Sequence, residues 1–271
     1  MTTTASLVRR LNSVVKAANK TKYYGAADPP IPTDIPSLES FQAIQPTPIL
    51  EYRTLRLGDT TTNPDAIKWV VGPYLGQSPH NVAYAEDSNA AEVRNNLFRH
   101  ALSQILPQVS VSSAAVIATH QRRYFGAEMA SILVRMGIHA HLFVDVEKRR
   151  VGPMLQAVGP SMLVALDDVE EAAIPASVEV CVTARQSQRF TQHAQIDLCV
   201  VDELGLLGYS TDCRTYNLNH AECHFEQSDS GHLMVTPFYN LLQPKLRIET
   251  LDKVEFIDST RATLTFSPIG S

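Results

Sequence analysis

Residues 111–144 read VSSAAVIATHQRRYFGAEMASILVRMGIHAHLFV and change their hydrophobic pattern twice. Residues 111–119 form a short apolar run of strand length, and 127–136 carry apolar residues at helical spacing. Gly137 follows that second segment, and glycine commonly caps a helix at its C-terminus. Apolar residues then alternate along 138–144. The stretch therefore predicts a strand, a helix and a second strand.

The same alternation continues on both sides of this stretch. Further strands are predicted at 162–166, 178–182 and 196–201, with helical stretches between them, and helices at 88–105 and 151–158. Strands that alternate with helices favour right-handed crossovers and a parallel sheet. We therefore expect an α/β fold, with a mainly parallel sheet and helices on both of its faces.

After residue 202 the pattern changes, and this predicts a C-terminal antiparallel β layer. Candidate strands at 232–236, 253–257 and 262–266 are joined by turns. Before residue 68, an apolar stripe at helical spacing is followed by a strap with six prolines between residues 24 and 50. We expect three portions, 1–67, 68–202 and 203–271, within one compact unit.

The basic N-terminal stretch has two interpretations. Five basic residues and no acidic residue precede Asp28. A surface helix that packs its apolar stripe on the domain has this pattern, and so does a transit peptide.

Composition excludes several classes of protein. The chain has 271 residues, of which 44% are hydrophobic and 19% charged, which is ordinary for a globular protein. No apolar run approaches the length of a membrane span, and the net charge of −5 argues against a nucleic-acid partner. Four cysteines are too few for a disulfide scaffold, so we expect a cytoplasmic protein.

Two segments could contribute to a phosphate site. Residues 72–79 read GPYLGQSP, and backbone N–H groups around Gly76 could face a phosphate, although a plain turn has the same composition. Residues 197–213 read DLCVVDELGLLGYSTDC, with Asp202 and Glu203 at the end of a predicted strand. Carboxylates at that position can hold Mg²⁺ beside a nucleotide, or can simply cap the strand in solvent.

Two further clusters carry ligand-type side chains. Arg247 and Asp252 lie in a turn-rich segment and could grip phosphate and ribose, or form a salt-bridged hairpin. The second cluster contains Cys213, His220, Cys223 and His224. Thiolates and imidazoles suit tetrahedral zinc, but buried small cysteines and surface histidines explain this cluster as well.

In order and spacing, these segments resemble the adenylate-forming (acyl-CoA synthetase) superfamily, in its phenylacetate-CoA ligase-like branch. That branch has a Tyr-Gly-x-x-Glu motif, a Glu-Cys pair, a Gly-x-Leu-x-x-Thr strand and a Pro-x-x-Arg-Tyr-x-Thr-x-Asp motif. The matching positions here are Glu203, Gly208, Asp212, Cys213, His220, Glu226, Gly231, Thr236, Pro244, Arg247, Thr250 and Asp252. The resemblance covers residues 5–257.

The resemblance implies an AMP-forming ligase or acyl-transfer enzyme that acts on an aromatic or acyl carboxylic acid in a biosynthetic pathway. It implies that Asp252 binds the ribose of ATP and that Glu203 helps hold Mg²⁺ and the phosphates. It places Arg247, Asp202 and Gly76 in the same nucleotide site. It further implies zinc near Cys213 and His220, with Cys223 or His224 completing the set, and a homodimer.

Several departures keep other functions open. The branch's threonine-rich phosphate loop reads PYLGQSP here, and its adenine-stacking tyrosine falls at Cys199. The chain ends soon after Asp252, so we expect a large domain without the mobile C-terminal domain, which a partner could supply. One alternative is a non-adenylating homologue that binds an acyl or aromatic ligand or a partner enzyme. Another is an enzyme that does not use ATP, with His120, Tyr124 or His220 as acid or base.

Overall fold

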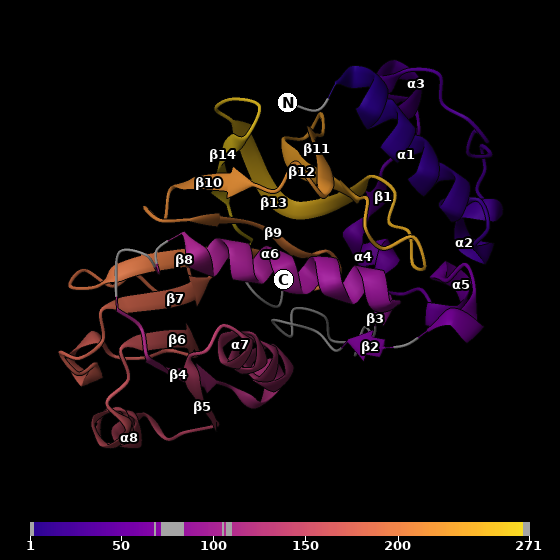
Figure 1. The fold of residues 1–271 in the computed structure, drawn as a ribbon. Helices are drawn as coiled ribbons and strands as arrows, with labels where there is room; N and C mark the ends of the chain where they lie inside the picture. The colour runs from indigo at the N-terminus through magenta and orange to yellow at the C-terminus, as the bar shows by residue number, and fades with distance from the viewer. Residues whose placement is uncertain (1–2, 68, 72–83, 105, 107–109, 268–271) are drawn as a thin grey trace. The chain divides into compact units, whose positions relative to one another are not determined.

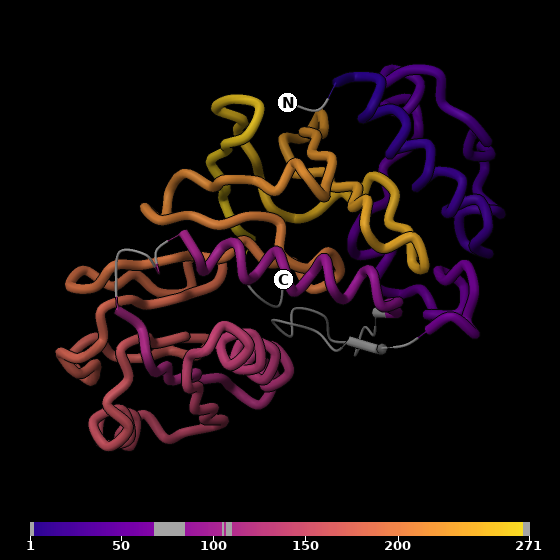
Figure 2. The backbone as a smooth tube through the Cα atoms, viewed as in Figure 1, coloured from indigo at the N-terminus to yellow at the C-terminus, as the bar shows by residue number. Residues whose placement is uncertain are grey.

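The computed structural model describes residues 3–67, 69–71, 84–104, 106 and 110–267 (Figure 1). They belong to two compact units, which are described separately. Unit 1 takes its described residues from 1–72, 80–93 and 219–255, and unit 2 from 73–79, 94–218 and 256–271. Each unit is therefore assembled from segments that are far apart in the sequence, as the backbone colours in Figure 2 show.

Unit 2 is built on a parallel sheet that matches the predicted strands. Its strands, in spatial order, are β5 (His139–Val144), β4 (Ser113–Ala118), β6 (Met162–Leu166), β7 (Val180–Ala184) and β8 (Ala194–Val201). Each neighbouring pair is parallel. Every residue of β6 and β7 is buried, which explains why these strands read as continuous apolar runs.

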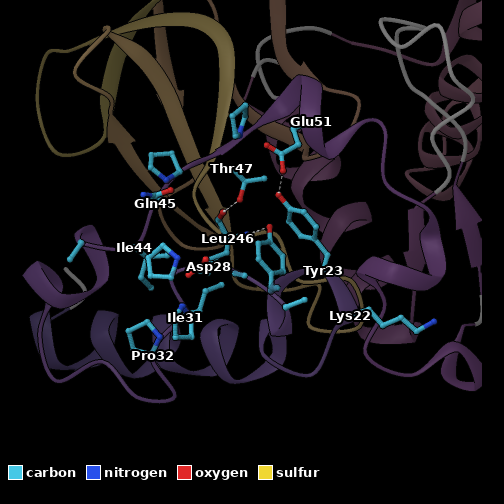
Figure 3. A pocket seen from close by; sticks show the side chains of 18 of the residues that line it. Lys22, Tyr23, Asp28, Ile31, Pro32, Ile44, Gln45, Thr47, Glu51 and Leu246 are labelled. Carbon is cyan, nitrogen blue, oxygen red and sulfur yellow. Dashed lines mark hydrogen bonds between the residues drawn. The ribbon is translucent and has the colours of Figure 1, made fainter.

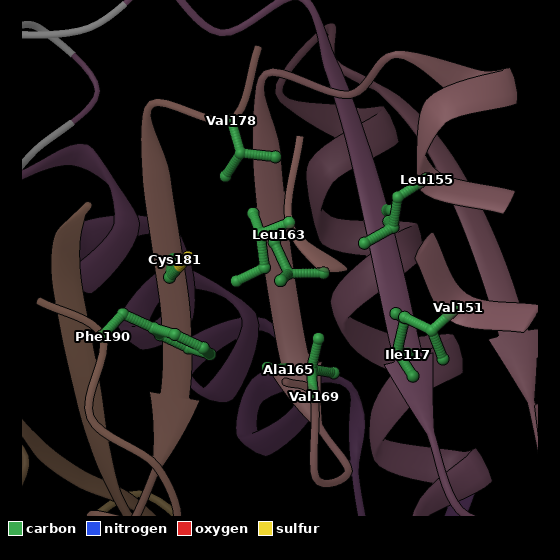
Figure 4. Close-up of a cluster of buried hydrophobic side chains, with 11 residues drawn as sticks. Ile117, Val151, Leu155, Leu163, Ala165, Val169, Val178, Cys181 and Phe190 are labelled. Carbon is green, nitrogen blue, oxygen red and sulfur yellow. The ribbon is translucent and has the colours of Figure 1, made fainter. Parts of the chain in front are cut away.

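Helices cover both faces of this sheet, as expected. A Cβ added to Gly126 of α7 (Arg123–Arg135) would lie 3.0 Å from the Ala118 side chain, on one face of β4. Val151 and Leu155 of α8 (Lys148–Val158) pack instead with Ile117 (Figure 4). Because neighbouring strand residues point to opposite faces, α7 and α8 lie on opposite sides of β4.

Beyond β8 the sheet of unit 2 becomes antiparallel. It continues through β9 (Gly205–Ser210), β10 (Thr215–Leu218) and β14 (Arg261–Thr265), each antiparallel to the strand before it. The helical stretches expected between β6, β7 and β8 are wrong. A three-residue 3-10 turn, Glu171–Ala173, follows β6, and residues 185–193 link β7 to β8 without a helix.

Unit 1 has its own antiparallel strands. β13 (Ile248–Phe256) pairs with β12 (His232–Pro237) in antiparallel fashion and with β1 (Thr47–Pro48) in parallel, and β11 (Cys223–Gln227) pairs antiparallel with β12. β2 (Trp69–Val71) and β3 (Tyr84–Glu86) pair antiparallel and form a separate two-stranded sheet. Helix α6 (Ser88–Ser103) follows β3 in the chain.

The N-terminal segment folds as a packed helix with a strap behind it. Helix α1 (Thr4–Ala18) begins after Thr3, whose side chain accepts a hydrogen bond from the Ser6 N–H. Its apolar stripe joins Phe41 and Phe238 in one buried cluster, as a surface helix would. Residues 22–60, which include the strap, form the short helices α2 (Lys22–Gly25), α3 (Leu38–Gln42), α4 (Ile49–Tyr52) and α5 (Leu57–Thr60). Among the described residues, no helix has the length and apolar character to cross a membrane.

Candidate active site

The acidic pair Asp202 and Glu203 lies at the carboxyl end of β8. The chain turns tightly there into β9, and the Leu204 N–H donates to the Val201 carbonyl at 3.0 Å. Asp202 is fully buried and Glu203 is 1% exposed. The alternative prediction, that this acidic pair caps the strand in solvent, is therefore wrong. Buried carboxylates need partners or cations, which makes this turn the first candidate for chemistry.

Arg185 lies at the carboxyl end of the neighbouring strand β7 and was not predicted. Arg185 and Gln186 both have left-handed backbone, with φ of 56° and 52°, in a tight turn closed by the Ser187 N–H on the Ala184 carbonyl at 3.1 Å. Non-glycine residues in this conformation cost about 1–3 kcal/mol each and concentrate at functional sites. The buried Arg185 guanidinium lies 4.7 Å from the ring centre of Phe266.

Asp197 holds this turn in place from inside the sheet. Its carboxylate accepts the Gln186 N–H on both oxygens at 2.9 Å, the Thr183 hydroxyl at 2.6 Å and the Tyr216 hydroxyl. Burial raises the pKa of Asp197, and these hydrogen bonds act in the opposite direction. Asp197 therefore fixes the backbone of the turn that contains Arg185 and Gln186.

A second arginine completes this edge of the sheet. Arg122, in the 3-10 turn His120–Arg122 after β4, donates from Nη1 to the Leu166 carbonyl at 2.7 Å. Burial lowers the pKa of Arg122, Asp167 and Asp202 raise it, and Arg185 lowers it further, so these groups are near enough to interact. The carboxyl ends of four parallel strands thus gather two guanidinium groups and several carboxylates, where α/β sheets bind ligands.

Two residues predicted as acid–base candidates also follow β4. The His120 N–H donates to Asp145 at 2.5 Å, and its ring Nδ1 lies 3.6 Å from the second Asp145 oxygen. Tyr124 is 53% exposed, with the Arg123 guanidinium 4.6 Å from its ring centre. Both side chains face solvent rather than the buried carboxylates.

Arg247, in unit 1, is held by the protein itself. Its Nε and Nη2 each donate to the Glu226 carboxylate at 3.1 Å, and its Nη1 donates to the carbonyls of Gln42 and Ile44. Of the two interpretations of its segment, the geometry matches the salt bridge, with Glu226 as the acidic partner. A phosphate would have to compete with these contacts, so phosphate binding by Arg247 stays a prediction.

Asp252 lies in β13 of unit 1 and is 2% exposed. Its N–H donates to the Thr250 hydroxyl at 3.2 Å. Gly76, together with the rest of segment 72–79, lies outside the described residues. The role of Asp252 in ribose binding and that of Gly76 in phosphate binding stay predictions.

The geometry gives the zinc prediction no support. Burial raises the pKa of Cys213, in unit 2, to about 11, and also raises that of buried Cys223 in unit 1. The His220 ring packs 4.9 Å from that of Phe225. Among the described residues, no group of three or more His, Cys, Asp or Glu side chains could hold a metal ion.

Comparison with known proteins identifies the fold. No family model and no curated protein matches the sequence. A solved structure of 2-hydroxyisobutyryl-CoA ligase, in complex with 2-HIB-AMP and CoA, is similar to this chain with a TM-score of 0.71 at 14% identity. The fold is that of the adenylate-forming ligases. The similarity covers 96% of this chain and 68% of the ligase chain.

More distant structures share part of this fold. They include an amide bond synthetase from Marinactinospora thermotolerans, with a TM-score of 0.51 at 13% identity over 75% of this chain and 49% of that one. o-Succinylbenzoate CoA synthetase from Bacillus subtilis follows with 0.50 at 10% identity, over 76% and 50% of the two chains. The expected fold class, the large domain of an adenylate-forming enzyme, is therefore confirmed.

Proposed function

We propose that this chain is an adenylate-forming ligase-like protein that activates a carboxylic acid with ATP and Mg²⁺. One observation carries the proposal: Arg122, Arg185, Asp202 and Glu203 follow the carboxyl ends of β4, β7 and β8, three strands of one parallel sheet in unit 2. The fold supports it, because the similar ligase was solved with an acyl-adenylate, 2-HIB-AMP. We infer an aromatic or acyl acid from the resemblance to the phenylacetate-CoA ligase-like branch.

Adenylation defines what these side chains would do. An oxygen of the acid's carboxylate bonds to the α-phosphorus of ATP, the bond from that phosphorus to the β-phosphate oxygen breaks, and pyrophosphate leaves. Arg122 and Arg185 would stabilise negative charge on the phosphates, because fixed donors act on charge that develops in the transition state. Glu203 would hold Mg²⁺, which prefers oxygen ligands. From the resemblance alone, ribose binding is assigned to Asp252 of unit 1.

A second candidate is a homologue that binds an acyl or aromatic ligand without adenylating it. The contacts of Arg247 favour it, because Glu226 and two backbone carbonyls engage three of its guanidinium nitrogens. Cys199, at the position of the adenine-stacking tyrosine, is also fully buried in β8. This candidate predicts acid binding in the absence of ATP.

Pyrophosphate exchange separates the two candidates. The protein is incubated with ATP, Mg²⁺, labelled pyrophosphate and a panel of aromatic and aliphatic acids. Adenylation predicts acid-dependent exchange that Glu203→Gln lowers by at least about tenfold, a loss of about 1.4 kcal/mol of transition-state stabilisation. Glu179→Gln, at an exposed acid of unit 2, is the matched control. Acid binding without exchange supports the second candidate.

The finer proposals have their own tests. Zinc at Cys213, His220 and Cys223 predicts metal in elemental analysis of the purified protein. A homodimer predicts twice the chain's mass in light scattering, whereas a partner that supplies a C-terminal domain predicts a larger complex purified from cells. We also propose a cytoplasmic location, which the low cysteine content supports, and a biosynthetic pathway, which the resemblance supports.

A further inference from the structure

Unit 1 contains a pocket of about 570 Å³ whose lining includes none of the residues assigned above (Figure 3). Its walls come from residues 22–32, from 40–51 and from Leu246. Ligand sites for small molecules commonly have volumes of about 300–1,000 Å³. The pocket is thus large enough for a small organic molecule.

Hydrogen bonds and prolines fix the walls of this pocket. The Leu246 N–H donates to the Tyr24 hydroxyl at 3.1 Å, and the Thr47 hydroxyl donates to the Leu246 carbonyl at 3.2 Å. Five prolines line it, at positions 29, 30, 32, 46 and 48, and each has a restricted φ. The shape is therefore largely formed before any ligand binds.

The pocket has aromatic and acidic walls. The rings of Tyr23 and Tyr24 meet edge to face with 4.8 Å between their centres. The Tyr23 hydroxyl donates to Glu51 at 2.6 Å, and Asp28 is the second acidic residue of the lining. This arrangement combines π-systems, proline surfaces and two carboxylates.

Lys22, the basic residue of the lining, is not paired with Asp28 or Glu51. Lys22 is highly exposed, its ammonium lies 3.9 Å from Asp59, and Asp59 is not part of the lining. Figure 3 shows the Lys22 side chain extending away from the pocket. The wall therefore keeps the negative charge of Asp28 and Glu51.

We propose that this pocket binds a small organic cation, an amine or guanidinium group carried on an apolar body. The carboxylates attract the positive charge, and tyrosine faces bind cations through the ring quadrupole. The proline and Ile31 surfaces would bury the apolar body. The same carboxylates repel acids and phosphates, so the expected ligand differs from the substrates of adenylation, and the proposal does not rest on the proposed function.

Three probes of similar size test the charge preference. Isotope-labelled protein is titrated with benzylamine, benzyl alcohol and benzoate, and the backbone amide resonances are followed by NMR. Benzylamine should shift the resonances of residues 22–32 and 43–51 saturably, and bind about tenfold tighter than benzyl alcohol. Equal or tighter binding of benzyl alcohol or benzoate overturns the proposal, as does the absence of a saturable shift with benzylamine.

Substitutions locate the cation. Glu51→Gln keeps an acceptor for the Tyr23 hydroxyl but removes the negative charge of Glu51. Asp28→Asn removes the negative charge of Asp28. Each should weaken benzylamine binding about two- to tenfold, as expected for a partly exposed ion pair. Glu39→Gln, at an exposed acid of α3 outside the lining, should leave it unchanged. If Glu51→Gln and Asp28→Asn both bind benzylamine as tightly as Glu39→Gln, the proposal is wrong.

Discussion

The Arg247 guanidinium and the Glu226 carboxylate form a two-point ion pair inside unit 1, with N···O distances of 3.1 Å at both contacts. The same guanidinium donates to the carbonyls of Gln42, at the end of α3, and Ile44. A residue expected to contact phosphate thus connects the N-terminal strap to β11 and to the start of β13. Its contacts are those of a structural residue, and its removal should affect folding.

Glu226→Gln should lower the free energy of unfolding by about 3–5 kcal/mol, because it leaves the buried guanidinium without an opposite charge. Urea denaturation measures the change. The matched control is Glu222→Gln, whose partner Arg10 is 33% exposed, and a pair of this kind contributes about 0–1 kcal/mol. Equal losses in the two variants would show that the Arg247–Glu226 pair adds no more than a surface pair.

Asp197→Asn should change how stability depends on pH. Burial raises the pKa of Asp197 in the folded chain, so the folded state holds this proton to a higher pH than the unfolded state. The resulting stabilisation is full below the unfolded pKa of about 3.9 and is lost as pH rises through the folded pKa. Urea unfolding at a series of pH values should show this decline in the native protein and a flatter profile in Asp197→Asn. Identical profiles in the two proteins would contradict a raised pKa for Asp197 in the folded chain.

Tyr216→Phe should destabilise the protein by about 1–2 kcal/mol, because it removes one hydrogen-bond donor from the buried Asp197 carboxylate. Thermal unfolding checks the loss. Tyr209→Phe, at a half-buried tyrosine of β9, is the comparison and should change stability less. The reverse order would mean that the Tyr216 hydroxyl contributes little to the network.

Gly208→Ala should destabilise unit 2 by about 1–3 kcal/mol through overpacking. A Cβ at this position would lie 2.5 Å from the Asn217 carbonyl oxygen in β10. Gly58→Ala in α5 is the control, since nothing lies within 4 Å of a Cβ there, and it should be neutral or slightly stabilising. Chemical denaturation of both variants measures the two changes in the free energy of unfolding. No change for Gly208→Ala would show that β9 and β10 can move apart to fit the methyl group at little cost in free energy.

The strands of the parallel sheet could be predicted from hydrophobic periodicity, whereas two of the helices expected between them do not form. The predicted strand at 162–166 has the bounds of β6, and the helix predicted from residue 88 begins at Ser88. Strands β9 and β10 were missed because their polar and apolar residues follow no clear alternation. The link from β7 to β8 contains no helix, because Arg185 and Gln186 form a tight turn.

The site was only partly visible in the sequence. Asp202 and Glu203 were predicted because a carboxylate pair ends an apolar run, and the structure buries both of them. Arg185 was missed because a left-handed non-glycine residue leaves no mark in a local pattern. The partner of Arg247 was missed for a different reason: Glu226 lies 21 residues away on another strand, and cross-strand pairing is a tertiary property. Asp197 did carry a signal, as a single acid within a buried strand.

Calorimetric titration with ATP and Mg²⁺ tests the central claim most directly, because it does not depend on knowing the acid. The proposed function predicts saturable binding at or below millimolar ATP, weakened at least about tenfold by Asp252→Asn. The control Asp229→Asn, at an exposed acid of unit 1, should bind as the native chain does. Absence of binding at millimolar ATP, or equal binding by Asp252→Asn and Asp229→Asn, would contradict adenylation at the proposed residues.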